Sequence, residues 1–304
     1  MESFNVVILG CGSALPTMKH QASAQLVEVR DKLFLIDCAE GTQQQLRKAK
    51  VRFGKLGHVF ISHIHGDHCF GLIGLISTFG LLGRTAPLHV FAPIGLKPVL
   101  DMQLQVFCQH LEYEVVFHAV DTTKENVVYE DRSLTVTAVP LAHRMPCCGY
   151  VFREKPLLPH IRRDLIDMYG IPVSEINNIK NGKDWVMDDG EVIANSKLVT
   201  PANPPRAYAY CSDTAYMPLL HESLRGVTTL YHESTYSTEY ENMADKYMHS
   251  TAKQAAMVAR DAGVGTLVLG HYSSRIECEE KLLDQAKEVF ENTILSNEMM
   301  KIQV

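Results

Sequence analysis

A short run of metal-binding residue types after an apolar strand constrains this chain more than any other feature. Residues 59–61 read as a buried strand that leads directly into the sequence Ser-His-Ile-His-Gly-Asp-His. Residues two apart in an extended segment project to the same side, so His63 and His65 can share one metal ion. The glycine that follows permits a sharp turn, after which Asp67 and His68 can face a second ion. Imidazole and carboxylate without thiolate favour Zn²⁺ in an open, hydrolytic site over a closed structural one.

Two metal ions need further ligands, and the sequence offers three at the ends of apolar strands. His143, Asp213 and His271 each follow a segment that reads as a strand. Loops that follow strands gather at one edge of a scaffold, which is where binding residues concentrate. Each of these residues alone is as easily explained as an ordinary loop residue. The combination with the histidine-rich run predicts a two-metal centre.

The order of elements predicts an α/β fold made of two mixed sheets with helices outside, an αββα sandwich. Consecutive strands followed by alternating strands and helices occur twice along the chain, as two packed sheets require. The stretch from 113 to 140 reads as a run of antiparallel strands. Residues 1–304 are predicted to form one domain, with a Pro-rich and charged insertion at about 153–206. The predicted helices are 42–50, 72–82, 95–110, 251–262 and 277–290.

Composition narrows the class of protein. The chain has 304 residues and a net charge of −6, which argues against a protein that holds nucleic acid over its whole surface. No apolar run approaches the roughly 20 residues needed to span a bilayer, and the N-terminus lacks a signal-peptide pattern. Eight cysteines are scattered without a C-x-x-C motif, which indicates reduced thiols. These features predict a cytoplasmic protein that does not enter a membrane.

Eight short segments in order resemble motifs of the metallo-β-lactamase superfamily and, within it, of the short form of ribonuclease Z. The likeness covers nearly the whole chain. The matching segments are Leu9–Pro16, Asp37–Gln43, Ser62–His68, Leu141–His143, Ser212–Thr214, His232–Thr235, His249–Thr251 and His271–Arg275.

The resemblance implies how the predicted ligands divide between two zinc ions. One ion would be bound by His63, His65 and His143, and the other by Asp67, His68 and His271, with Asp213 bridging them. Two cations about 3.5–4 Å apart lower the pKa of a shared water and hold the attacking and leaving oxygens of an in-line displacement.

The resemblance also implies an activity and its catalytic residues. The family cleaves the 3′ trailer from precursor tRNA and leaves a 3′-hydroxyl on the tRNA and a 5′-phosphate on the trailer. His249, oriented by Glu233, resembles the family's proton donor. Asp67 would accept a proton from the attacking water.

RNA contacts and assembly are further implications of the resemblance. Arg275 would contact phosphate near the metal ions, and Lys19 lies where the family has a basic loop that contacts tRNA. Segment 153–206 corresponds to an arm that binds the tRNA elbow from the partner subunit of a homodimer. This segment lacks the family's Gly-Pro signature and has Ile171-Pro172 in its place. A second local positive patch consists of Arg47, Lys48, Lys50, Arg52 and Lys55, although a solvated helix face explains these residues somewhat better.

Two other functions remain open at this stage. The same fold supports other hydrolases, including phosphodiesterases and thioester or sulfate-ester hydrolases. The Glu233 and His249 pair and the H-x-S-x-R segment favour ribonuclease Z over these. A non-catalytic binding protein is disfavoured because every expected ligand is present.

Overall fold

The computed structural model describes residues 3–304, which divide into two compact units. The main unit comprises residues 3–153 and 206–304, and the inserted unit is Glu154–Pro205. Among the described residues, no helix is long and apolar enough to cross a membrane.

The first sheet of the main unit has seven strands and is mixed. β1 runs antiparallel to β18 and β2, β2 is antiparallel to β3, and β3 to β6 are parallel to one another. The strands in spatial order are β18 (Lys301–Gln303), β1 (Phe4–Gly10), β2 (Ala24–Val29), β3 (Lys32–Ile36), β4 (Leu56–Phe60), β5 (Leu88–Pro93) and β6 (Val115–Val120).

The second sheet also has seven strands. β14 to β17 are parallel, β9 is antiparallel to β14, and β7 is antiparallel to β8. In spatial order they are β17 (Thr293–Leu295), β16 (Thr266–Gly270), β15 (Thr229–Glu233), β14 (Ala207–Cys211), β9 (Cys147–Glu154), β8 (Leu134–Leu141) and β7 (Asn126–Glu130).

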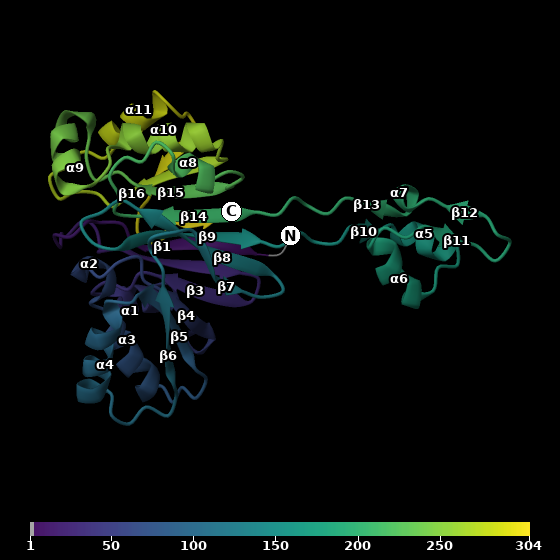
Figure 1. Cartoon of the computed structure of the whole chain (residues 1–304), viewed down its shortest axis with the longest axis horizontal. Coiled ribbons are helices and arrows are strands. Elements are labelled where there is room, and N and C mark those ends of the chain that lie inside the picture. The colour runs from purple at the N-terminus through teal and green to yellow at the C-terminus, as the bar shows by residue number, and fades with distance from the viewer. Residues whose placement is uncertain (1–2) are drawn as a thin grey trace. The chain divides into compact units, whose positions relative to one another are not determined.

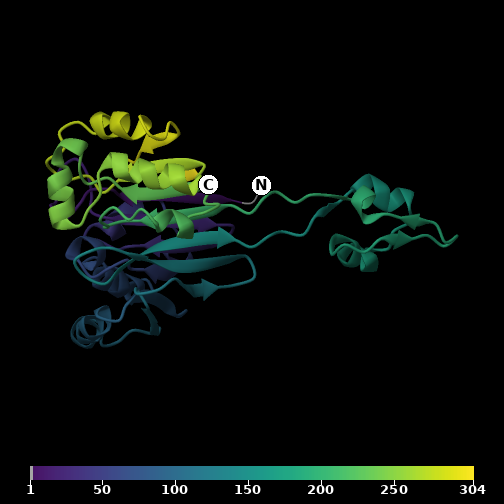
Figure 2. The same cartoon turned by 45° about the horizontal axis from the view of Figure 1, so that its top comes forward.

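Helices cover the outer face of each sheet, and the prediction of an αββα sandwich is confirmed (Figure 1). The first sheet carries α1 (Thr42–Lys48), α3 (Leu72–Leu81) and α4 (Leu96–Phe107), packed over an apolar cluster that includes Leu46 and Ile76. The second sheet carries α8 (Leu220–Ser223), α10 (Ala252–Ala262) and α11 (Glu280–Lys287). Figure 2 shows the yellow-green helices α10 and α11 over the second sheet and the blue helices on the opposite side. Aromatic side chains such as Phe60 and Tyr150 fill the space between the sheets.

Two features differ from the sequence-based expectation. The stretch from 113 to 140 is not one antiparallel run, because β6 is parallel to β5 in the first sheet whereas β7 and β8 belong to the second. The strand β9 was not predicted. Gly149 interrupts its apolar pattern, but a Cβ there would lie 2.6 Å from the carbonyl oxygen of Tyr210 on β14. The glycine therefore permits close pairing instead of marking a loop.

The inserted unit has its own small apolar core. Ile171, Ile179, Ile193 and Leu198 are buried together. The surrounding elements are β10 (His160–Ile161), α5 (Arg163–Met168), α6 (Val173–Lys180), β11 (Trp185–Val186), β12 (Val192–Ile193), α7 (Asn195–Leu198) and β13 (Val199–Thr200).

Candidate metal centre

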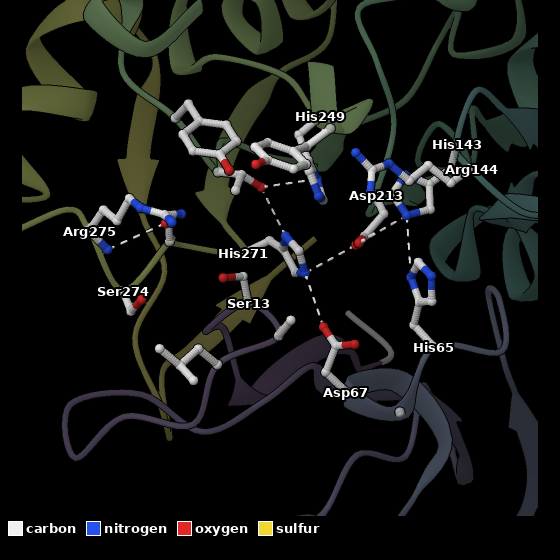
Figure 3. A pocket seen from close by; sticks show the side chains of 17 residues that line it. Ser13, His65, Asp67, His143, Arg144, Asp213, His249, His271, Ser274 and Arg275 are labelled. Carbon is white, nitrogen blue, oxygen red and sulfur yellow. Dashed lines mark hydrogen bonds and ion pairs between the residues drawn. The ribbon is translucent and has the colours of Figure 1, made fainter. Parts of the chain in front are cut away.

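The predicted ligands come from loops that follow the carboxyl ends of strands, and the fold brings all seven together. The histidine-rich loop follows β4, and three single residues follow β8, β14 and β16. Two groups of side chains result, and within each group the ligand atoms all lie within 4.8 Å of one another. Of these residues, Figure 3 labels His65, Asp67, His143, Asp213 and His271. The first group is His63, His65, His143 and Asp213, and the second is Asp67, His68, Asp213 and His271.

Asp213 belongs to both groups and directs one carboxylate oxygen to each. Its Oδ2 lies 3.7 Å from His63 Nε2 and 3.8 Å from His143 Nε2. Its Oδ1 lies 3.2 Å from His68 Nε2 and 3.1 Å from His271 Nε2. A carboxylate in this position can join two cations, which is the arrangement required of a two-metal site.

Three ligand atoms of the second group face other ligands of that group as ion pairs and make no hydrogen bonds within residues 3–304. Asp67 Oδ2, His68 Nε2 and His271 Nε2 are buried and have no hydrogen-bond partner in the described chain. Buried polar atoms are almost always satisfied, so three unsatisfied electron-pair donors directed at one point need a cation to explain them. The residues present therefore fit a divalent metal ion with nitrogen and oxygen ligands.

The far sides of the imidazole rings are held by oxygen atoms. His68 Nδ1 lies 2.7 Å from Asp37 Oδ2, His143 Nδ1 lies 2.9 Å from the carbonyl of Met248, and His271 Nδ1 lies 2.9 Å from Thr235 Oγ1. Such bonds fix the ring orientation and leave the other nitrogen for a metal. Asp37 and Thr235 have no predicted role from sequence. Asp37 lies in the Asp37–Gln43 motif, which was the available signal.

The protonation states suit metal binding as well. Burial, together with the neighbouring His68, lowers the pKa of His63 to about 2, so its ring is neutral. Burial raises the pKa of Asp213, but the surrounding histidines outweigh it and hold that pKa well below its usual range. Metal ions bind neutral imidazole and ionised carboxylate, so His63 and Asp213 lose no proton on binding one. Burial lowers the pKa of His68, but the surrounding carboxylates outweigh it and raise that pKa, so a metal ion displaces a proton from this ring.

His249 and Glu233 form a hydrogen-bonded pair beside the second group. His249 Nδ1 lies 2.8 Å from Glu233 Oε1, and the Glu233 carboxylate also accepts a hydrogen bond from the backbone N–H of Thr214 at 2.7 Å. The rings of His249 and His271 are stacked with centroids 5.6 Å apart. Burial lowers the pKa of His249, but the Glu233 carboxylate outweighs it and raises that pKa to about 9. His249 is thus protonated and positioned to donate a proton.

A hollow of about 720 Å³ opens over the two groups of ligands. Arg275 lines it, and its guanidinium group has no ion pair within residues 3–304 (Figure 3). Arg144 also lines it, which the sequence did not suggest; its guanidinium lies 4.8 Å over the ring of Tyr247 and donates to the carbonyl of Lys246 at 2.9 Å. Lys19 is not among the lining residues and pairs with Glu279 at 2.7 Å.

Comparison with solved structures defines the class of protein. The chain superimposes on human tRNase Z, short form, with a TM-score of 0.71 and 23% identity, covering 98% of each chain. It superimposes on the metallo-beta-lactamase fold protein YhfI from Bacillus subtilis with a TM-score of 0.70 and 17% identity, covering 100% of each. The chain therefore has the metallo-β-lactamase fold, with two groups of side chains at the edge of its sheets that could hold metal ions.

Sequence relatives identify the family within that class. The family described as Anti-Pycsar protein Apyc1 matches residues 4–159. Ribonuclease Z of Bacteroides fragilis strain YCH46 is 56% identical over 304 residues, covering 100% of both chains. The chain belongs to the ribonuclease Z family.

Proposed function

We propose that this enzyme is a zinc-dependent endoribonuclease that removes the 3′ trailer from precursor tRNA. The observation that carries the proposal is the position of Asp213, shared by two ligand groups and bordered by the His249–Glu233 pair. Membership in the ribonuclease Z family and the likeness to human tRNase Z support RNA, and tRNA in particular, as the substrate.

The two ligand groups would hold two zinc ions per chain. His63, His65 and His143 would bind one ion, Asp67, His68 and His271 the other, and Asp213 both. Bound divalent cations lower the pKa of a water molecule and offset the negative charge of a phosphate. Asp67 would also accept a proton from that water.

The remaining residues act on the phosphate and the leaving group. Attack on phosphorus forms a P–O bond with the water oxygen and breaks the bond to the 3′-oxygen of the tRNA. His249 donates its proton to that 3′-oxygen, and Glu233 stabilises the protonated ring. The unpaired guanidinium of Arg275 would bind a phosphate oxygen. The products are a tRNA with a 3′-hydroxyl and a trailer with a 5′-phosphate.

The inserted unit is the proposed RNA-binding arm of a homodimer. Among its basic residues, Arg162 pairs with Asp164 and Lys183 pairs with Glu175, both at 3.0 Å. Arg163 and Lys180 have no ion pair in the described chain and remain available for phosphate groups. Sedimentation of the purified enzyme at micromolar concentration tests the dimer. The eight free cysteines support a reducing, cytoplasmic location.

A cleavage assay tests the proposed function directly. The zinc-loaded enzyme is incubated with a 3′-extended precursor tRNA and, separately, with a small chromogenic phosphodiester. We expect a single cut after the tRNA body and a trailer bearing a 5′-phosphate. Asp67→Ala should abolish cleavage of both substrates. Hydrolysis of the small diester without cleavage of the precursor would assign the enzyme to another substrate of the same fold.

A further inference from the structure

A second hollow of the main unit is lined by basic side chains and lies away from the metal centre. It has a volume of about 580 Å³ and lies between the outer face of the first sheet and the segment that follows α1. Its lining includes six basic and two acidic residues in a chain whose net charge is −6. The basic residues are Arg30, Lys48, Lys50, Arg52, Lys55 and Lys301, and the acidic ones are Glu28 and Asp31.

Most of this positive charge is not neutralised by the protein. Glu28 is engaged by Lys301 at 3.5 Å and by the side-chain amide of Asn5 at 3.1 Å. Four basic residues, at the end of α1 and in the segment after it, have no ion pair within residues 3–304, and all four are exposed. They are Lys48, Lys50, Arg52 and Lys55. Like charges gathered in one concavity repel one another and attract anions.

The backbone supplies a second, independent observation. Among residues 3–304, six non-glycine residues have a positive φ; three lie at or beside the metal centre, and the other three line this hollow. The first three are Asp37, Met248 and His271, and the second three are Arg30, Lys50 and Met299. A left-handed backbone disfavours residues with a Cβ, so such positions cluster where a side chain is needed for function.

Lys50 is a charged residue at a backbone position that favours glycine. It follows the C-cap of α1 with φ of 55°, where helices usually have glycine. The chain follows that rule at α10, which ends in Gly263 with φ of 65°. At α1 it has a lysine instead, directed to the hollow. A lysine at a position that favours glycine indicates that its positive charge has a function in the hollow.

The hollow and the metal centre lie on the same unit and are linked by continuous elements. Val7 of β1 lines the hollow, whereas Ser13, six residues later, lines the metal centre. Six residues of extended chain span at most about 20 Å. Helix α1 makes a second link, since its seven residues extend over roughly 10 Å from the Asp37 segment to Lys48. Lining residues of the two hollows therefore lie within about 20 Å of each other, a distance that a bound polynucleotide can span.

We propose that this basic hollow is a binding site for the phosphate backbone of the RNA substrate. The lining contains no aromatic side chain, and its floor is aliphatic, with Val7, Leu26 and Leu33. Bases are recognised by stacking on aromatic rings, so the hollow suits phosphates rather than bases. Binding here is independent of sequence and depends on salt. The inference rests on the proposed function for the identity of the RNA.

The first experiment removes the charge. A variant with Lys48, Lys50, Arg52 and Lys55 changed to glutamine is compared with a matched control in which Lys97, Lys124, Lys253 and Arg260 are changed to glutamine. The control loses the same charge from exposed surface ion pairs. For precursor tRNA we expect the hollow variant to raise KM about tenfold at unchanged kcat. We also expect a slope of log kcat/KM against log salt that is smaller by roughly three. Hydrolysis of a small phosphodiester should not change. Equal KM values for the two variants would overturn the proposal.

The second experiment separates binding from folding. Lys50→Gly relieves the left-handed backbone strain, so it should keep or raise Tm while it raises KM for RNA two- to fivefold. A loss of RNA affinity that only accompanied a lower Tm would indicate a structural role and contradict the proposal.

A third experiment, with two measurements, distinguishes a failure of this RNA-binding proposal from a failure of the proposed tRNA cleavage. Affinity for labelled precursor tRNA is measured by fluorescence anisotropy in a His249→Ala background, with and without the four glutamine substitutions. Weaker binding in the substituted protein supports the hollow even if the parent enzyme fails to cleave precursor tRNA, which would refute only the proposed function. Calorimetry with pyrophosphate is the other arm. Tight pyrophosphate binding that the four substitutions abolish, with RNA affinity unchanged, would assign the hollow to a small phosphate ligand and overturn the proposal.

Discussion

Asp37 and His68 form a pair with no solvent exposure, with Asp37 Oδ2 lying 2.7 Å from His68 Nδ1. The same carboxylate accepts hydrogen bonds from the hydroxyl of Tyr210 at 2.6 Å and from the backbone N–H of Ser62 at 2.8 Å. Asp37 therefore joins the second sheet to the histidine-rich loop of the first and fixes the ring of one predicted ligand. Asp37 is a positioning residue for the metal centre: it orients His68 but belongs to neither ligand group.

Asp37→Asn should weaken metal binding without removing a ligand. The amide cannot accept the same bonds from His68, Tyr210 and Ser62, and loss of such a supporting group costs about 10–100-fold in metal affinity. Competition with a chelator of known zinc affinity measures this effect. Asp101→Asn, on the surface of α4, serves as the control. Unchanged zinc affinity in Asp37→Asn would show that the ring of His68 is positioned by other contacts.

Asp213→Ala should lower the zinc content more than replacement of a residue that belongs to only one ligand group. Asp213 belongs to both ligand groups, whereas His143 belongs to one. Zinc content measured by atomic absorption after dialysis should therefore fall from about two ions per chain to one or fewer in Asp213→Ala, and to about one in His143→Ala. His110→Ala, at an exposed site outside both groups, should retain two. Equal zinc content in Asp213→Ala and the control would remove Asp213 from the metal centre.

Glu233→Gln should slow cleavage and move its pH dependence. A general acid acts only in its protonated form, so kcat falls as pH rises through the pKa of that acid. The Glu233 carboxylate raises the pKa of His249, so its replacement by a neutral amide should shift the alkaline limb of the kcat profile to lower pH. His249→Ala should lower kcat about 10²–10⁴-fold with little change in KM. An alkaline limb at the same pH in Glu233→Gln would assign it to another group.

The metal ligands could be predicted from the sequence because each belongs to a short local pattern. His63 to His68 lie within six residues, and the other three ligands each follow a clear apolar strand. The fold class followed from the same alternation of strands and helices. The parallel pairing of β5 and β6 was missed because the direction of a strand depends on the crossover of α4, which periodicity does not report.

Residues whose role depends on tertiary contacts could not be predicted from sequence patterns. Asp37 meets Tyr210 across 173 positions of the chain. Arg144 is positioned by Tyr247 and the carbonyl of Lys246, about one hundred residues further along the chain. The basic segment after α1 was explained somewhat better as a solvated helix face, because its concavity and left-handed Lys50 appear only when β1 to β3 are packed beneath it.

The last prediction concerns stability and a histidine remote from the metal centre. His58 on β4 packs against the ring of Tyr129 at 4.8 Å and stacks on His89 at 5.2 Å. Burial, together with the neighbouring His89 and His118, lowers the pKa of His58 to about 4. The unfolded chain binds a proton near pH 6.5 and the folded chain only near pH 4. Between these values the unfolded state holds more protons, so folding stability contributed by a neutral His58 is complete above pH 6.5 and is lost as pH falls towards 4.

Replacing His58 by phenylalanine should remove this dependence while preserving the aromatic packing. When pH falls from 7 to 5, the parent enzyme should lose about 2 kcal/mol more unfolding free energy than His58→Phe loses. Denaturant titrations at the two pH values measure it. The metal ligands are the same in both proteins, so their contribution cancels in the comparison. A difference that stays constant between pH 7 and pH 5 would mean that His58 takes up a proton in the folded protein as readily as in the unfolded chain.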